Sequence, residues 1–442
     1  MTKPPAASTT PTRLVGDYLL RCDGGHELIP GGAVDIGADG RIVACGRESD
    51  LPTFEGSVQR IGGLLMPGLV NAHCHTPMSL MRSAGEGLPL DRWLLEGVWP
   101  REGRMSPDDA WWGMALGSIE MLRAGVTTSA EMYLFEDQLI DAVEATGARL
   151  HMMAGLISVV LPDADALAAR LAAITELGEQ HDSSAGRITI GFGPHSTYDL
   201  RPEQLGDMAA AAVAADAMLH IHLEETKAER ELVQERYGRS ATQVLADAGV
   251  FEARVSVAHG VWLDADDRRL LGEGGASVIH CPQSNLKLGS GIADVAALLD
   301  AGIAVGLGTD GPASNDNLDL WEELRLAPML ARGIATDPAA MTIATALDLA
   351  TRGGAQALGM TDIGELAPGR WADVIRLDLD QPAFQPGLAA DLLGHIVWAA
   401  GAQHVTDVWV AGRRVVSAGE VTMIDRHEAQ REVTRRAATL VD

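Results

Sequence analysis

The sequence places two histidines, His73 and His75, two residues apart at the end of an apolar stretch. On a strand, residues two apart point to the same face, so both imidazoles would face one side while Cys74 faces the other. Such a pair can bind one metal ion, or it can be a hydrogen-bonded structural pair. His222 and Asp310 favour the metal, because three imidazoles and a carboxylate form a mixed nitrogen and oxygen site suited to zinc or iron(II). The residues themselves leave the choice between those metals open.

Two other motifs that could carry chemistry fail on their context. The stretch GLGTDG, residues 306–311, has the GxGxxG spacing of a dinucleotide-binding loop. That fold would want an acidic residue after a second strand about twenty residues further on, where this chain has the helix-like stretch APMLARG. His222 and Glu224 match the HxE of cytidine-type deaminases, but the PCxxC partner is absent.

Short apolar segments alternate with Ala/Leu-rich stretches through the middle of the chain. Residues 165–180, for example, show the spacing of a helix that covers a sheet. Eight such strand-then-helix units predict a (β/α)8 barrel of the TIM type, with a doubly wound open sheet as the main rival. The expected strands are 68–73, 125–132, 148–155, 187–193, 218–223, 254–259, 276–280 and 303–310.

The predicted strand ends collect the polar residues that a site would need. Functional groups of such a barrel lie at the carboxyl ends of its strands. Seven of the thirteen histidines fall there, together with Asp310; they are His73, His75, His195, His220, His222, His259 and His280.

The two ends of the chain have a different texture. Segments 12–65 and 365–420 hold short apolar runs broken by glycines, and they predict one small β-sandwich domain built from both ends around a barrel at 66–364. Asp39 and Gly40 indicate a hairpin turn, and Gly412 a second turn. Residues 1–11, rich in Pro, Thr and Ser, are expected to be disordered, and 421–442 to form a C-terminal helix.

The composition limits the kinds of molecule that the protein is expected to bind and the compartment in which it is expected to work. A formal net charge of −27 over 442 residues argues against nucleic acid and suits a small-molecule substrate. Four widely spaced cysteines favour a reducing compartment. The N-terminus lacks a signal-peptide core, and no apolar run is long enough to span a bilayer, so no membrane contact and a cytoplasmic location are expected.

A resemblance to a known family then becomes specific. MPGLVNAHCHTPMSLMR, GFGPHSTYDL, HIHLEET, AHGVWL, HCPQSNLKLGSG and GTDGPASNDNLDL resemble successive signatures of the amidohydrolase superfamily. They most resemble its methylthioadenosine/S-adenosylhomocysteine deaminase branch. GELAPGRWADVIRLD and VWVAGRRVV are similar to the family's returning β domain. The resemblance implies a homo-oligomeric enzyme that hydrolyses an adenine nucleoside to the inosine analogue and ammonia.

The same resemblance assigns the chemistry. It implies His73, His75, His222 and Asp310 as metal ligands, and it implies a single divalent metal per subunit, zinc or iron. Binuclear relatives carry a lysine at the end of strand four, where this chain has 193–195, Gly-Pro-His. A bound metal lowers the pKa of its water and supplies hydroxide.

The resemblance also names the groups that act on protons. It makes Glu225 the carboxylate that moves a proton between water and purine N1, and His259 a group that polarises the hydroxide. Asp310 would also accept a hydrogen bond from the water. The plainer alternatives are a solvated loop carboxylate for Glu225, as assumed for its neighbour Glu224, and a core histidine for His259.

Substrate contacts are implied in the same way. Glu102 matches a glutamate that grips ribose hydroxyls, and Arg170 an arginine near the 5′ substituent. His195 matches a position near the nucleoside, with a structural role as the alternative. Ser314 is expected to touch the base, and Trp93 either lines the ligand or packs in the core.

One departure bears on the substrate. Some relatives carry a second arginine twelve residues before Arg170, where this chain has Ser158. Its absence favours adenosine, 5′-deoxyadenosine or methylthioadenosine over S-adenosylhomocysteine. The rival activities are a guanine, pterin or triazine type of deaminase or hydrolase and, remotely, a non-catalytic scaffold. His220 and His280 are left as packing or supporting residues.

Overall fold

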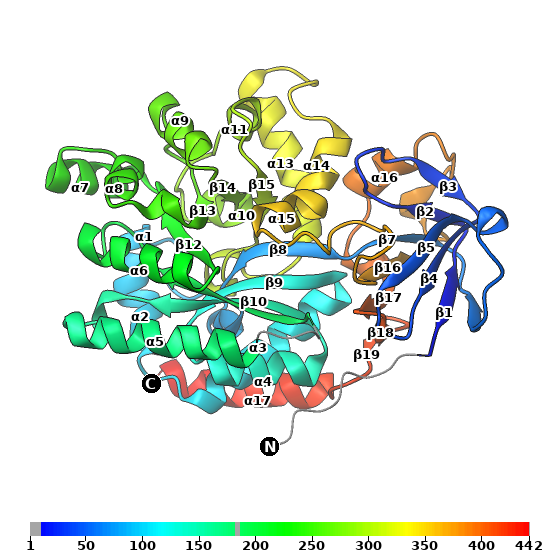
Figure 1. Ribbon diagram of the computed structural model, residues 1–442, viewed down its shortest axis with the longest axis horizontal. Helices are drawn as coiled ribbons and strands as arrows, with labels where there is room; N and C mark the ends of the chain where they lie inside the picture. The colour runs from blue at the N-terminus through cyan, green and yellow to red at the C-terminus, as the bar shows by residue number, and fades with distance from the viewer. Residues whose placement is uncertain (1–9, 182–185, 442) are drawn as a thin grey trace.

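A computed structural model describes residues 10–181 and 186–441. Its centre is a sheet of eight parallel strands in the order β15-β14-β13-β12-β11-β10-β9-β8, in which each strand lies beside its neighbour in sequence (Figure 1). This order confirms the barrel and excludes the doubly wound sheet, whose strand order reverses. The strands are β8 (Leu69–Cys74), β9 (Val126–Tyr133), β10 (Arg149–Leu156), β11 (Ile188–Pro194), β12 (Met218–Leu223), β13 (Arg254–His259), β14 (Ser277–His280) and β15 (Val305–Leu307).

The first and last strands meet through the residues that follow them. The Asp310 backbone N–H donates to the His73 carbonyl at 3.0 Å, and the Thr309 N–H donates to the Asn71 side chain at 3.0 Å. These bonds bring the end of β15 back beside β8, so residues 238 positions apart lie side by side at one end of the barrel.

Helices cover the outside of this barrel, as the alternating texture predicts. Proline at N1 starts α3 and α6, and a serine cap with a reciprocal bond to Asp109 holds the start of α3. The helices after the strands are α3 (Pro107–Arg123), α4 (Glu136–Thr146), α5 (Ala164–His181), α6 (Pro202–Ala214), α7 (Lys227–Tyr237), α8 (Ala241–Asp247), α9 (Ala265–Glu273), α10 (Pro282–Lys287), α11 (Val295–Asp300), α12 (Pro312–Asn315), α13 (Leu320–Ala335), α14 (Ile343–Ala350) and α15 (Arg352–Ala357).

Strands from both chain ends form two further sheets beside the barrel, at the right of Figure 1. The four-stranded sheet holds β5 (Ile42–Arg47), β4 (Gly32–Ile36), β1 (Thr12–Val15) and β6 (Ser57–Arg60) in that order. The seven-stranded sheet runs β19 (Glu420–Val421), β18 (Arg413–Ser417), β17 (Val405–Val410), β16 (Val374–Leu377), β7 (Leu64–Pro67), β2 (Tyr18–Leu20) and β3 (Leu28–Pro30). Pairing of β7 with β16 joins the two chain ends.

Both predicted turns lie between antiparallel partners. The β4–β5 pair encloses Asp39 and Gly40, and the β17–β18 pair encloses Gly412, whose φ is +74°. Whether the two sheets are a domain with the predicted boundaries stays a prediction, although β7 ends two residues beyond the expected limit of 65.

Four helices lie outside the alternating pattern. They are α1 (Leu90–Arg92), α2 (Trp99–Glu102), α16 (Leu392–Trp398) and α17 (Arg426–Val441). The last of these begins five residues after the predicted start at 421 and runs beneath α3 and α4 (Figure 1). Most of the segment expected to be disordered, residues 1–9, lies outside the described residues.

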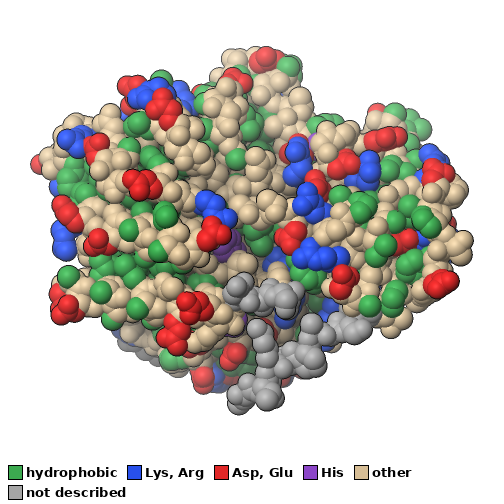
Figure 2. Space-filling model, viewed as in Figure 1, with side chains coloured by type: hydrophobic (Ala, Val, Ile, Leu, Met, Phe, Trp, Pro, Cys, Tyr) green, Lys and Arg blue, Asp and Glu red, His purple; other side chains and the backbone are tan. Residues whose placement is uncertain are grey.

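Two surface findings bear on partners. Within the described residues, no helix has the length and hydropathy needed to cross a membrane. Acidic and basic side chains are interspersed on the face shown in Figure 2. The four cysteines, which the sequence analysis takes to favour a reducing compartment, are free.

Candidate metal centre and active site

The residues of the expected site come together at the carboxyl end of the barrel. His73 is the last residue but one of β8, and His75 follows the strand directly. His222 and His259 lie at the carboxyl ends of β12 and β13. Asp310 follows β15 by three residues. The strand topology alone produces this convergence, because all eight carboxyl ends lie at one rim.

The side chains of the four predicted ligands are within contact of one another. His75 Nε2 lies 3.3 Å from His222 Nε2 and 3.3 Å from Asp310 Oδ1. His73 Nε2 lies 3.4 Å from the same Asp310 oxygen. The ligand atoms of His73, His75 and Asp310 lie close enough together to hold one metal ion, and so do those of His73, His222 and His259.

Backbone carbonyls fix which imidazole nitrogen is free. His75 Nδ1 donates to the Met132 carbonyl at 2.6 Å, and His222 Nδ1 donates to the His195 carbonyl at 2.8 Å. Since a carbonyl only accepts, each Nδ1 carries the proton and each Nε2 presents a lone pair to the centre. Sequence patterns do not reveal these carbonyls, because which backbone acceptor lies near a side chain depends on strand register.

His73 is held by another imidazole. Its Nδ1 lies 2.7 Å from His220 Nε2, and His220 Nδ1 lies 2.6 Å from Ser256 Oγ. His220, whose role the sequence left open, therefore supports a ligand. The other open case, His280, is buried and has neither ring nitrogen hydrogen-bonded.

These residues fit a divalent cation. His73 Nε2 is buried and has no hydrogen-bond partner, which is costly for a polar atom unless a ligand meets it. Burial lowers the pKa of His73 to about 4 and that of His222 well below its usual value, so both imidazoles are neutral and able to coordinate. Burial alone would raise the pKa of Asp310, but the His73 ring nitrogen 3.4 Å away and the surrounding imidazoles hold it well below its ordinary range.

The second oxygen of Asp310 is held by two hydroxyls. Ser284 Oγ donates to Oδ2 at 2.6 Å and Ser314 Oγ donates to the same atom at 2.8 Å. Asp310 itself has a φ of +60°, an unusual conformation for a residue other than glycine. Ser314, expected from the sequence to touch the base, is fully buried and in this structure contacts the metal ligand instead.

Glu225 and His259 form a buried pair beside the centre. Glu225 Oε2 lies 3.7 Å from His259 Nε2, and Ser290 Oγ donates to Glu225 Oε1 at 3.3 Å. Asn285 Oδ1 lies 2.9 Å from His259 Nδ1, which fixes the ring. Burial raises the pKa of Glu225, while the nearby His259 lowers it. Glu225 is therefore not the solvated loop carboxylate of the plainer alternative.

The expectation for Glu224 is wrong. Its side chain is fully buried, where it pairs with Arg230 at 3.1 Å and accepts the Ala241 N–H at 3.1 Å. A following helix, α7, packs back over the strand end and supplies that arginine. Glu229 on the same helix accepts the backbone N–H groups of Glu224 and Glu225 at 3.2 and 2.8 Å, which holds the loop.

Glu102 lies close to the centre from the other side. It stands at the end of α2, and Tyr133 donates its hydroxyl to Glu102 Oε1 at 2.5 Å. The Tyr133 ring centroid is 6.3 Å from that of His75. Burial raises the pKa of Glu102, and the Tyr133 hydroxyl and the nearby His75 lower it.

His195 and Arg170, the other two residues expected to contact the substrate, differ in their surroundings. His195 stacks edge-on against His222 at 5.2 Å, with its Nδ1 3.6 Å from Asp199. Arg170 pairs with Glu136 and donates to the Gly155 carbonyl at 3.0 Å.

Trp93 is buried in the main core and donates its indole N–H to the Ala84 carbonyl at 2.8 Å. That contact supports the packing alternative for this residue.

Sequence reasoning did not single out several supporting residues. They are Tyr133, Glu229, Ser256, Ser284, Asn285 and Ser290. The motif HCPQSNLKLGSG contains three of them, and its run of small polar residues after a strand was the available signal.

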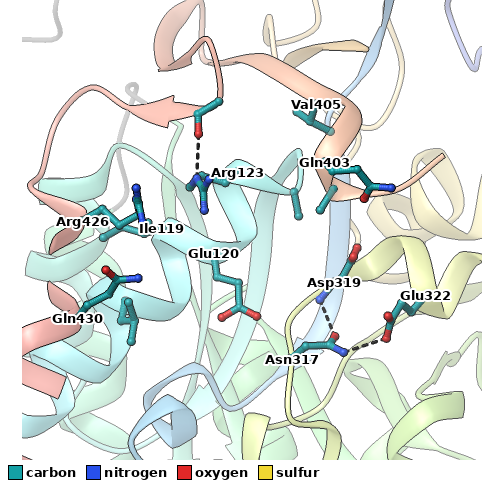
Figure 3. A pocket seen from close by; sticks show the side chains of 14 residues that line it. Ile119, Glu120, Arg123, Asn317, Asp319, Glu322, Gln403, Val405, Arg426 and Gln430 are labelled. Carbon is teal, nitrogen blue, oxygen red and sulfur yellow. Dashed lines mark hydrogen bonds between the residues drawn. The ribbon is translucent and has the colours of Figure 1, made fainter. Parts of the chain in front are cut away.

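A separate cavity of about 630 Å³ lies between α3, the start of α13 and α17 (Figure 3). Glu120, Asp319 and Glu322 face it together with Arg123. It is lined by none of the four predicted metal ligands.

Fold and site together define a metal-dependent hydrolase, and comparison with known proteins agrees. The Amidohydrolase family profile matches residues 64–415, and the chain belongs to that family. It is 40% identical to the 5-methylthioadenosine/S-adenosylhomocysteine deaminase of Pelotomaculum thermopropionicum, over 97% of this chain and 98% of that one. It is 41% identical to the enzyme of the same name from Moorella thermoacetica, over 84% and 86%.

Solved structures give the same assignment. An adenosine deaminase from Xanthomonas campestris with bound zinc superposes with a TM-score of 0.91 at 33% identity, covering 97% of this chain and 98% of that chain. An atrazine chlorohydrolase from Arthrobacter aurescens, complexed with zinc, has a TM-score of 0.88 at 26% identity, covering 96% and 100%. The chain is therefore an amidohydrolase with a site for a divalent metal.

Proposed function

We propose that this protein hydrolyses the 6-amino group of an adenine nucleoside to give the inosine analogue and ammonia. The observation that carries the proposal is the buried Glu225–His259 pair beside the three histidines and Asp310. It supports the transfer of a proton next to an activated water. Relatives about 40% identical over nearly the whole chain bear the name of such a deaminase.

We propose one metal ion, zinc, held by His73, His75, His222 and Asp310. A divalent cation there would lower the pKa of water and so provide the nucleophile near neutral pH. The donor set also suits iron(II), another divalent metal.

The chain's own groups then handle the protons. Glu225 takes a proton from the attacking water and passes it to purine N1, while His259, fixed by Asn285, orients the oxygen. Bond formation at C6 gives a tetrahedral carbon. The second proton of the attacking water then moves to the amino group. The C6–N bond breaks, ammonia leaves, and the carbonyl forms at C6. A raised pKa brings Glu225 nearer to the working pH, as a group that both accepts and donates requires.

We also propose that Glu102 accepts the ribose hydroxyls and that His195 lies against the nucleoside. Arg170 is already paired with Glu136, and Ser158 is bound to Asp199 through its hydroxyl at 2.5 Å. The charge of Arg170 is thus already balanced by Glu136, and Ser158 has no charge to offer a substrate carboxylate. This supports adenosine, 5′-deoxyadenosine or methylthioadenosine over S-adenosylhomocysteine.

The second candidate is the hydrolysis of another aminoheterocycle. Its support is the close structural likeness to the Arthrobacter chlorohydrolase. A screen of adenine nucleosides, free purines, pterins and triazines, in which turnover is measured as ammonia release and as a change in absorbance, tests both candidate functions. Turnover confined to free bases or triazines would overturn the nucleoside proposal.

A cytoplasmic location and a homo-oligomeric state remain predictions from the sequence and the family resemblance. Fractionation and a solution mass measurement would check them.

A further inference from the structure

Glu323 is a fully buried carboxylate on α13 that the chemistry above does not use. Its Oε2 accepts the backbone N–H of Gln283 at 3.1 Å, and its Oε1 accepts from Asn315 Nδ2 at 2.7 Å. Gln283 Nε2 in turn donates to the Asn315 carbonyl at 3.1 Å. One side chain therefore ties the start of α10 and the end of α12 to the long helix α13.

The two segments that Glu323 joins carry the hydroxyls that hold Asp310. Ser284 follows Gln283 directly, and Ser314 precedes Asn315. Both hydroxyls donate to Asp310 Oδ2, at 2.6 and 2.8 Å. With Oδ2 held in this way, Oδ1 faces His73 and His75 at 3.4 and 3.3 Å.

The same segment also fixes His259. Asn285, two residues after Gln283, presents its Oδ1 to His259 Nδ1 at 2.9 Å. A displacement of the start of α10 would therefore move the supports of Asp310 and of His259 together. Carboxylates and carbonyls that orient metal ligands typically change metal affinity or activity when they are replaced.

The hydrogen bonds at Glu323 require two acceptors. The Gln283 N–H is a backbone donor and cannot change. Asn315 Nδ2 also donates to the Thr309 carbonyl at 2.7 Å, so turning the amide over would set its oxygen against that carbonyl. Burial raises the pKa of Glu323, and these donors lower it. A proton on either carboxyl oxygen would point at an N–H group that is itself a donor. An amide in place of the carboxylate would direct an N–H at one of the two donors.

We propose that Glu323 is a positioning residue, which sets the orientation of Asp310 and His259 by holding the start of α10 and the end of α12. Its effect on turnover rests on the proposed function, whereas its effect on metal affinity does not.

The test compares Glu323→Gln with Glu322→Gln in the purified full-length protein. Glu322 is the adjacent residue on α13 and loses the same charge, but it faces the separate cavity, where it accepts from Asn317 at 2.8 Å (Figure 3). Zinc affinity is measured by competition with a chromophoric chelator, and kcat and KM by ammonia release from adenosine.

Glu323→Gln should raise the zinc Kd and lower kcat by roughly 10- to 100-fold, with KM little changed. Glu322→Gln should stay within a few-fold of the parent. A Glu323→Gln protein with parental zinc affinity, or an equal loss in Glu322→Gln, would overturn the proposal. If zinc affinity falls as expected but no nucleoside is turned over by the parent, the proposed function fails and the positioning role stands.

Ser284→Ala provides a second path if Glu323→Gln does not fold. It removes one hydroxyl from Asp310 without disturbing the buried carboxylate, and it should lower zinc affinity in the same direction. Where both variants fold, the double variant should lose less than the product of the single losses, because both act on Asp310. Parental zinc affinity in Ser284→Ala, or independent multiplicative losses in the cycle, would count against the proposal.

Discussion

Replacing Glu102 with alanine should remove most of the preference for substrates that carry ribose hydroxyls. Glu102 is partly buried, and one of its oxygens already accepts the Tyr133 hydroxyl at 2.5 Å. An ionised carboxylate can accept about four hydrogen bonds, so two positions or more are left for a cis-diol. Tyr133, which holds Glu102, has its ring centroid 6.3 Å from that of His75, and this places the carboxylate near the predicted metal site.

The magnitude follows from the number of bonds and from burial. A hydrogen bond to a charged group contributes about 1.5–3 kcal/mol, and partial exposure favours the lower figure. Two such bonds give about 3 kcal/mol, which is on the order of a hundredfold in kcat/KM. Wild-type enzyme should therefore favour adenosine over 2′,3′-dideoxyadenosine by about that factor, and Glu102→Ala should reduce the ratio to a few-fold.

The assay is a double cycle of the enzyme change and the substrate change, read as kcat/KM from ammonia release. Tyr133→Phe is the matched control, because it removes the hydroxyl from Glu102 Oε1 and leaves the carboxylate. It should retain most of the preference for the diol. Additive losses in the Glu102 cycle would refute the ribose assignment and would move free bases or triazines ahead as substrates.

Three further predictions concern the metal, the proton and the separate cavity. Active protein should contain about one divalent metal per chain, and His222→Ala should lose both metal and turnover; full activity in stripped protein would contradict this. Glu225→Gln should lower kcat by about 10²–10⁴-fold with metal retained, and a variant kcat within a few-fold of the parent would return Glu225 to a structural role. Because burial raises the pKa of Glu225, kcat/KM of the parent should fall on acidification with a midpoint above the ordinary 4.5. Burial raises the pKa of Asp319 from 3.8 to about 6, so the folded state binds the extra proton between these two values and stability falls as pH rises across that window. Asp319→Asn, which keeps an acceptor for the Trp321 N–H, should therefore raise the free energy of unfolding more at pH 8 than at pH 4, by up to about 3 kcal/mol; urea titrations that give equal gains at both values would show the shift to be absent.

The sequence by itself determined the barrel and the set of predicted metal ligands. Apolar periodicity is a local property, so all eight barrel strands could be located from it. Barrel topology then brings the carboxyl ends of those strands to one rim, which makes residues such as His73, His222 and Asp310 neighbours before any coordinates are known. The family motifs added the roles of Glu225 and Glu102, which neither spacing nor composition could assign.

Only the tertiary structure decided the surroundings of those groups. Glu224 and Glu225 are adjacent in sequence and alike in type, yet one is bound by Arg230 and the other faces His259. The partner of each depends on which later segment packs over the strand end. Ser284 reaches Asp310 across 26 residues, and Glu323 reaches Gln283 across 40, and such pairings have no local signature. The ligand set follows from the topology of the barrel, but its orientation follows from long-range hydrogen bonds that form only when α10, α12 and α13 pack together.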